Sequence, residues 1–302
     1  MTKSSESKHS EPIKANAPFD VSDKWSVLRE VTRLDPTLDH QRIAFLSATY
    51  DFPWDTQRAY ELALLRTFAV PRSSELLLST EEFTKRTQKR YDDTTIIIST
   101  IGFYGYDSPE GRAAIRRMNQ LHARYAIPNE EFLYVLSTFV LEPLRWNAAY
   151  GWRALSEQER QASFYFWREV GRRMNIRDIP ATLDKLETFS LDYEAEHFAY
   201  SEANERLAQV TRDLFLSWVL PKPLHVVGKP FVHVMLGEKL CAAFGFPKPP
   251  LWAKVLVRMG LEARKRALRL TQPRQTPYTL PTTRSYPAGY EVSELGPTSH
   301  EA

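Results

Sequence analysis

The chain has 302 residues, of which 43% are hydrophobic, so it is long enough to bury a core in one large domain or two small ones. Its formal net charge of only +3 predicts no nucleic-acid partner, because attraction to phosphates requires a larger basic excess. The single cysteine, Cys241, excludes an intramolecular disulfide and a cysteine-rich metal site.

Helical patterns follow one another through the N-terminal part of the chain. The expected helices are 22–33 with Ser22 as N-cap, 39–48, 55–68 and 80–91. The run Thr94–Thr100 is rich in β-branched residues, which favours a strand. A single strand would have no pairing partner, so we predict a helix here as well.

The helix bearing His122 comes next and has clear boundary signals. Ser108 is a suitable N-cap, and Pro109 suits the first helical position. We expect this helix to end before Pro128, which disfavours helical geometry at the residue preceding it. Apolar residues recur at helical spacing with the histidine, so one face carries Ile115, Met118, His122 and Tyr125.

The remaining helices follow the same pattern. A helix from Asn129 is predicted to kink at Pro143, since proline cannot donate a backbone hydrogen bond. Ser156 and Glu159 form a capping box that opens the next helix. Two further helices are predicted to begin after the N-caps Thr182 and Ser201. The last two predicted helices cover 230–244 and 251–270.

These elements predict an all-α fold. We expect a single large helical domain over 21–271, a disordered N-terminal tail over 1–20 and an irregular C-terminal tail over 272–302. The first 20 residues are polar, and no apolar run is long enough to cross a bilayer. The expected location is therefore intracellular, either cytoplasmic or peripherally associated with a membrane.

The surroundings of His122 allow two interpretations. An imidazole on an apolar helical face is usually a core residue bonded to a backbone carbonyl. The same helix, however, carries several cations, namely Arg112, Arg116, Arg117 and Arg124. A neutral imidazole, apolar walls and cations for the propionates are what a haem requires.

An ordered series of motifs favours the second interpretation. Arg90-x-x-x-Thr94 precedes the helical His122 by 28 residues. Further matching segments are Tyr134–Pro143, Phe166–Pro180 and Pro273-Arg274. Over roughly residues 40–290 the chain resembles the catalytic domain shared by the MpaB-type oxygenases of fungal secondary metabolism and the rubber oxygenase called latex-clearing protein.

The resemblance implies a site and an activity. His122 would be the proximal iron ligand of a b-type haem, and Arg90 and Thr94 would line the haem pocket between the helices. Nδ1–H of the His122 ring is expected to donate to a backbone carbonyl or a carboxylate. Dioxygen would be the co-substrate, and the other substrate would be a lipophilic small molecule, oxygenated or cleaved at a C=C bond of a prenyl-like chain.

The sequence also departs from the rubber oxygenase pattern. Asp93 stands where that enzyme has a lysine that can cap the iron, so Asp93 is either a distal base, acting beside Thr94, or a helix cap. Asn119 and Ala126 stand where it has arginines. Contacts to the haem would then come from Asn119 and from another arginine, such as Arg116. No residue matches its catalytic glutamate.

Two other functions remain open. Glu194 and His197 have the i, i+3 spacing found in di-iron carboxylate bundles, although no second such pair is present. A non-haem di-iron oxidase is therefore one alternative. The other is a non-catalytic helical carrier of a lipophilic ligand.

The basic segment 251–270 also has two interpretations. It combines an apolar stripe that includes Trp252 and Met259 with clustered cations that include Arg258 and Lys265. The helix either packs on the body with a solvated face or makes a peripheral contact with anionic lipid.

Overall fold

The computed structural model describes residues 21–279 and 283–297. The predicted N-terminal tail, 1–20, lies outside the described residues. Within them the fold is all-α, as predicted, and contains no strand. The α-helices are α1 (Ser26–Val31), α2 (His40–Leu46), α3 (Pro53–Thr67), α4 (Pro71–Ser79), α5 (Glu82–Lys85), α6 (Thr87–Tyr104), α7 (Pro109–His122), α8 (Asn129–Tyr150), α9 (Glu157–Arg173), α10 (Leu183–His197), α11 (Glu202–Ser217), α12 (His225–Ala243) and α13 (Leu251–Leu270).

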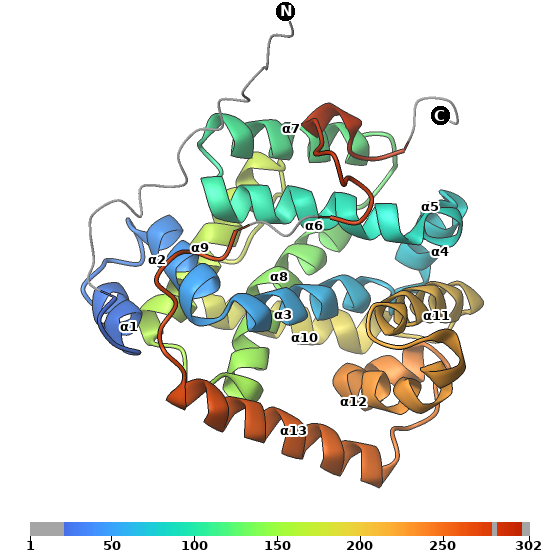
Figure 1. Cartoon of the computed structure of the whole chain (residues 1–302). Helices are drawn as coiled ribbons and strands as arrows, with labels where there is room; N and C mark the ends of the chain where they lie inside the picture. The colour runs from blue at the N-terminus through green and yellow to red at the C-terminus, as the bar shows by residue number, and fades with distance from the viewer. Residues whose placement is uncertain (1–20, 280–282, 298–302) are drawn as a thin grey trace, which may run out of the picture.

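Short elements complete the described part of the chain. A π-helical segment, η1 (Ser47–Asp51), joins α2 to α3, and 3₁₀ turns occur at η2 (Lys222–Leu224) and η3 (Val292–Glu294). In Figure 1, α3 crosses the central α8, and α6 and α7 form a layer above them. Helices α10, α11 and α12 lie on the other side, and α13 runs along the lower edge of the molecule.

The buried core lies between these layers. Helix α8 is buried along most of its length and meets α3, α9 and α10. It runs without a break through Pro143, where the sequence predicts a kink. The predicted helix over Thr94–Thr100 is confirmed within α6, because Ile96, Ile97 and Ile101 are buried in the core between α6 and its neighbours.

Several predicted boundaries are wrong. The first helix begins at Ser26, and Ser22 caps nothing. The predicted helix over 80–91 does not exist as one element. Thr80 instead follows the end of α4, and Arg86 has the non-helical angles φ −134° and ψ 43° that separate α5 from α6.

Helix α7 also ends earlier than predicted. Its last residue is His122, and the chain then turns through the residues that precede Pro128. The histidine therefore lies at a helix end rather than in a helix interior.

A buried ion cluster holds η1 against α9. The Arg153 guanidinium contacts the Asp51 carboxylate at 2.5 Å and the Glu159 carboxylate at 2.7 Å. Glu159 also closes the predicted capping box with Ser156. Burial raises the pKa of Asp51 to about 6 against the opposing effect of Arg153. One arginine therefore compensates two buried carboxylates.

We expect Arg153→Met to lower the free energy of unfolding by about 3–5 kcal/mol, because it removes the guanidinium that two buried acids share. Arg160→Met is the matched control, since Arg160 makes a surface pair with Glu157 at 3.5 Å and should cost under about 1 kcal/mol. Urea unfolding of both variants measures the difference. Equal losses would contradict the role given to Arg153.

Candidate functional site

The tight turn between α6 and α7 sets the geometry of the site. Gly105 ends α6 with φ 83°, and the Ser108 side chain caps α7 by accepting from the Gly111 backbone N–H at 2.9 Å. A Cβ at Gly111 would lie 1.9 Å from the Gly105 carbonyl oxygen, so only glycine fits there. Helix α7 therefore folds directly back along α6, and its end at His122 comes beside the beginning of α6.

His122 is a half-buried residue whose imidazole is neutral. Its Nδ1 is fully buried and has no hydrogen-bond partner, and its ring lies edge-on to Phe132 with centroids 5.2 Å apart. Burial, assisted by the nearby charge of Arg90, lowers the pKa of His122 to about 4. Because Nδ1 has no partner, the prediction that it donates to a carbonyl or a carboxylate is wrong. The ring is unprotonated at neutral pH and can offer a lone pair to a metal.

Arg90 and Thr94 lie one turn apart on α6 and contact each other. The Arg90 guanidinium donates to the Thr94 hydroxyl and lies 4.9 Å from the centre of the Phe83 ring. Burial lowers the pKa of Arg90, and the nearby Asp93 opposes that shift. The structure thus brings together three predicted site residues, with Arg90 between Thr94 and His122.

The structure does not bring Arg116 and Asn119 into this group. Arg116 is exposed, and the Asn119 side-chain amide donates to the Arg173 carbonyl at 2.9 Å. Both line a shallow hollow on the surface of α7, together with Arg112. Their expected contact with a haem therefore has no support in the arrangement of α7.

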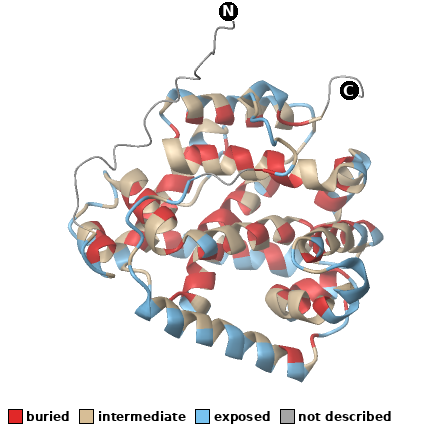
Figure 2. Ribbon diagram, viewed as in Figure 1, coloured by how far each residue is buried: buried red, intermediate tan, exposed pale blue. Residues whose placement is uncertain are grey.

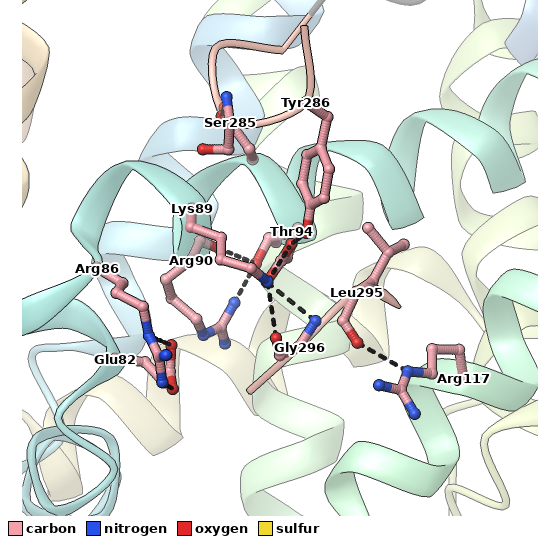
Figure 3. A network of polar contacts seen from close by, with 12 residues as sticks. Glu82, Arg86, Lys89, Arg90, Thr94, Arg117, Ser285, Tyr286, Leu295 and Gly296 are labelled. Carbon is pink, nitrogen blue, oxygen red and sulfur yellow. Dashed lines mark hydrogen bonds and ion pairs between the residues drawn. The ribbon is translucent and has the colours of Figure 1, made fainter. Parts of the chain in front are cut away.

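Asp93 is engaged by the C-terminal segment 283–297, which we call the strap. Figure 3 shows Tyr286 and Gly296 of the strap beside Lys89 and Thr94 of α6. Its carboxylate accepts hydrogen bonds from the Tyr286 hydroxyl at 2.5 Å, the Gly296 backbone N–H at 3.0 Å and the Lys89 ammonium at 2.9 Å. Asp93 lies within α6, so the predicted helix-capping role is wrong. A distal base would have to break these bonds, and the contacts instead favour an anchoring role.

Further contacts hold the strap on α6 and α7. Lys89 donates to the Gly296 carbonyl at 2.7 Å, and Arg117 donates to the Leu295 carbonyl at 2.8 Å. Asp92, next to Asp93, accepts from the Ser285 backbone N–H at 2.8 Å. Leu295 is fully buried in the main core. The described segment 283–297 of the predicted C-terminal tail therefore belongs to the folded body.

A cavity of about 190 Å³ opens on the other side of α6. Helices α3, α6, α8 and α9 and segment η1 form its walls, and Thr94 is among its lining residues. Three aromatic rings, those of Tyr60, Phe139 and Trp167, pack together in its wall with centroids 5.0–5.7 Å apart. Thr94 therefore belongs both to the group that it forms with Arg90 and His122, which we call the Arg90 cluster, and to the wall of the apolar cavity.

Hydrogen-bonded polar side chains also line the cavity, and one such pair lies on α3 and α6. The Tyr91 hydroxyl donates to the Glu61 carboxylate at 2.7 Å, and burial raises the pKa of Glu61. Sequence reasoning missed this cavity, because its walls come from four separate helices and no local motif marks them. The only signal was the aromatic content of 12%.

Glu194 and His197 do not form a metal site. The Glu194 carboxylate contacts the Arg66 guanidinium at 2.6 Å, while the His197 ring stacks on Tyr193 with Nδ1 3.1 Å from the Tyr193 carbonyl. The described part of the chain contains no group of three or more His, Cys, Asp or Glu side chains placed to hold a metal. The pair therefore gives no support to a di-iron centre.

Residues 61–265 match the family described as "ER-bound oxygenase mpaB/B'/Rubber oxygenase, catalytic domain". The chain belongs to this family. The resemblance drawn from Arg90, Thr94 and His122 is thereby confirmed at the level of the family. No helix in the described residues is both long and apolar enough to span a membrane.

Similar proteins come from two fungi. The chain is 30% identical over 212 residues to the ER-bound oxygenase mpaB of Penicillium roqueforti (strain FM164), covering 64% of this chain and 71% of that protein. It is 29% identical over 245 residues to the ER-bound oxygenase mpaB' of Penicillium brevicompactum, covering 75% of this chain and 57% of that protein. The chain thus spans little more than half of the second relative.

The fold is similar to that of a solved structure, latex clearing protein LCP in the closed state. The two share 16% sequence identity with a TM-score of 0.53, over 82% of this chain and 74% of that one. At this identity the likeness shows the all-helical fold alone.

We expect Tyr286→Phe to loosen the strap, because it removes a hydrogen bond to a carboxylate that is worth about 1.5–3 kcal/mol. Amide exchange across 283–297 should accelerate by about 10–100-fold. Tyr290→Phe is the control, since its ring packs 5.9 Å from that of Tyr286 but its hydroxyl does not bond to Asp93. Unchanged exchange in Tyr286→Phe would show that the strap does not depend on Asp93.

Proposed function

We propose that this protein is a haem-dependent oxygenase that acts on a lipophilic small molecule, with His122 as the axial ligand of a b-type haem. Membership of a family of oxygenases supports the reaction class, and both Penicillium relatives are named oxygenases. The observation that carries the haem assignment is the neutral imidazole of His122, whose buried Nδ1 has no hydrogen-bond partner, beside the cation Arg90.

The residues present fit a haem. A neutral histidine nitrogen is the usual protein ligand of haem iron, and Phe132 gives His122 an apolar neighbour. Arg90 supplies a half-buried positive charge for a propionate, and the Thr94 hydroxyl can share that contact. When bound, the haem would supply the activation of dioxygen, while the protein supplies position and polarity.

The cavity behind Thr94 is where we place the lipophilic substrate. Its aromatic walls exclude water and can hold an unsaturated or prenyl-like chain by contact with ring faces. The pair formed by Glu61 and Tyr91 is a fixed polar feature that can orient a substrate hydroxyl. Thr94 lies at the boundary and brings the reacting end of the chain toward the Arg90 cluster. We place a C=C bond of the substrate at this end.

We expect protein produced with haem supplied to show a Soret absorbance band and to contain iron with porphyrin. His122→Ala should lower haem affinity by at least about tenfold, since losing even a hydrogen-bond partner of a metal-binding histidine costs about 10–100-fold in metal affinity. His197→Gln is the control, because His197 is held by Tyr193 away from this site. Absorbance titration with hemin and iron analysis measure both variants.

The same measurements separate the alternatives. Iron without porphyrin, lost in His197→Gln, would instead support a di-iron oxidase. Bound haem without oxygen consumption in the presence of any alkene substrate would support a carrier. A His122→Ala variant with an unchanged Soret band would contradict the ligand assignment.

We expect Gly102→Leu to obstruct the substrate cavity without harming the fold. Gly102 lines the cavity, and a Cβ added there meets no heavy atom within 4 Å, so a larger side chain has open space to enter. Gly102→Ala is the control and should stabilise α6 by about 0.5–1 kcal/mol. Oxygen consumption should fall in the leucine variant alone, with haem content equal in both. Full activity in Gly102→Leu would contradict the placement of the substrate.

A further inference from the structure

Helix α13 exposes the apolar part of its surface. Of its 20 residues only Ala253 is buried, and Figure 2 shows exposed and intermediate residues along its whole length. Large apolar side chains are open to solvent, including Met259 at 62%, Leu256 at 50% and Trp252 at 49%. A surface of this kind is rare on soluble proteins unless it binds a partner or a membrane.

These side chains form one continuous row. Trp252, Val255 and Met259 recur at i, i+3 and i+7, so they share one face of α13. The opposite face bears the buried Ala253 and the Arg264 that pairs with Asp55 on α3. These apolar side chains therefore lie on the side of α13 away from α3, while a charged residue faces α3.

Neighbouring residues on α12 extend the row. The Phe231 ring packs edge-on against Trp252 with centroids 5.6 Å apart. Val227, one turn earlier on the same helix, is 58% exposed. We call this combined surface of α13 and α12 the apolar row.

Cations accompany the apolar row. Helix α13 carries six Lys or Arg residues and one Glu. Arg258 and Lys265 lie two turns apart on one flank of the row, and neither forms an ion pair within the described residues. A second copy of the chain would bring the same positive charges to the contact, whereas an anionic lipid surface complements them.

We propose that the apolar row of α13 docks on an anionic membrane surface, with Trp252 and Met259 inserted at the level of the headgroups and Arg258 and Lys265 facing lipid phosphates. The helix lies in the plane of the interface and does not span it. This docking does not depend on haem.

The position of α13 gives the docking a consequence for the proposed function. The Arg264 guanidinium lies 4.0 Å from the centre of the Trp54 ring, and Pro53 beside it lines the cavity. Tyr278, which follows α13 along the chain, lines the cavity as well. A lipophilic substrate dissolved in the bilayer would therefore meet the protein close to the cavity wall.

Co-sedimentation of the full chain with vesicles tests the docking. The wild type should bind phosphatidylcholine vesicles that contain phosphatidylserine and bind pure phosphatidylcholine much more weakly. The double variant Trp252→Glu with Met259→Glu should lower the partition coefficient by at least about tenfold, because two charges enter the interface. Leu38→Glu is the control, since Leu38 is 80% exposed outside the apolar row.

A second pair of variants tests the charge. Arg258→Glu with Lys265→Glu should remove the preference for phosphatidylserine, whereas Lys185→Glu with Arg33→Glu, an equal charge change at exposed sites elsewhere, should keep most of it. Added salt should weaken binding of the wild type. Equal melting temperatures establish that the variants fold.

Three outcomes would overturn the proposal. They are absence of binding to both kinds of vesicle, wild-type binding by the Trp252 and Met259 variant, and a dimer in sedimentation that this variant dissociates. The last would identify a second copy as the occupant of the row. Because each measurement is made with and without hemin, a failure here is distinguishable from a failure of haem binding.

Discussion

Gly111 must lack a side chain, because a Cβ there would lie 1.9 Å from the Gly105 carbonyl oxygen. This close approach lets α7 return along α6 without a longer loop, and the rest of the site follows from it. The return brings His122 beside Arg90. Burial next to a fixed cation keeps the imidazole neutral, which is the protonation state that binds iron. The same cation is then available to an anionic group of a ligand.

Local sequence patterns predicted which helices form better than the residues at which these helices begin and end. Ser108 and Ser156 cap helices as expected, because a cap depends on residues within one turn. The helix expected over 80–91 did not form as one element, because the helix that starts at Pro71 ends only just before Thr80 and the chain leaves helical geometry again at Arg86. The β-branched run Thr94–Thr100 became helical because Ile96 and Ile97, with the adjacent Ile101, are buried against other helices, and tertiary packing outweighs intrinsic propensity.

The candidate site was predictable only where one short segment determines it. Arg90 and Thr94 share one turn of α6, so their contact follows from spacing. The role of Asp93 does not follow from local spacing, because its partner Tyr286 is 193 residues away along the chain. A buried aspartate that accepts from three donor groups is costly to free, and the strap thus ties the C-terminal segment to the helix that carries Arg90.

Helix α13 shows what periodicity leaves undetermined. The spacing of Trp252 and Met259 fixes that they share a face, but not which face meets the protein. The structure places Arg264 inward, where Asp55 neutralises it and Trp54 covers it, and leaves the apolar residues outward. The inward arginine forms two hydrogen bonds to Asp55, so rotating the helix to bury the apolar row would separate a charge pair that is buried on the aspartate side. The outward face is therefore held in place by the inward one, and within the described residues most of its apolar side chains stay open to solvent.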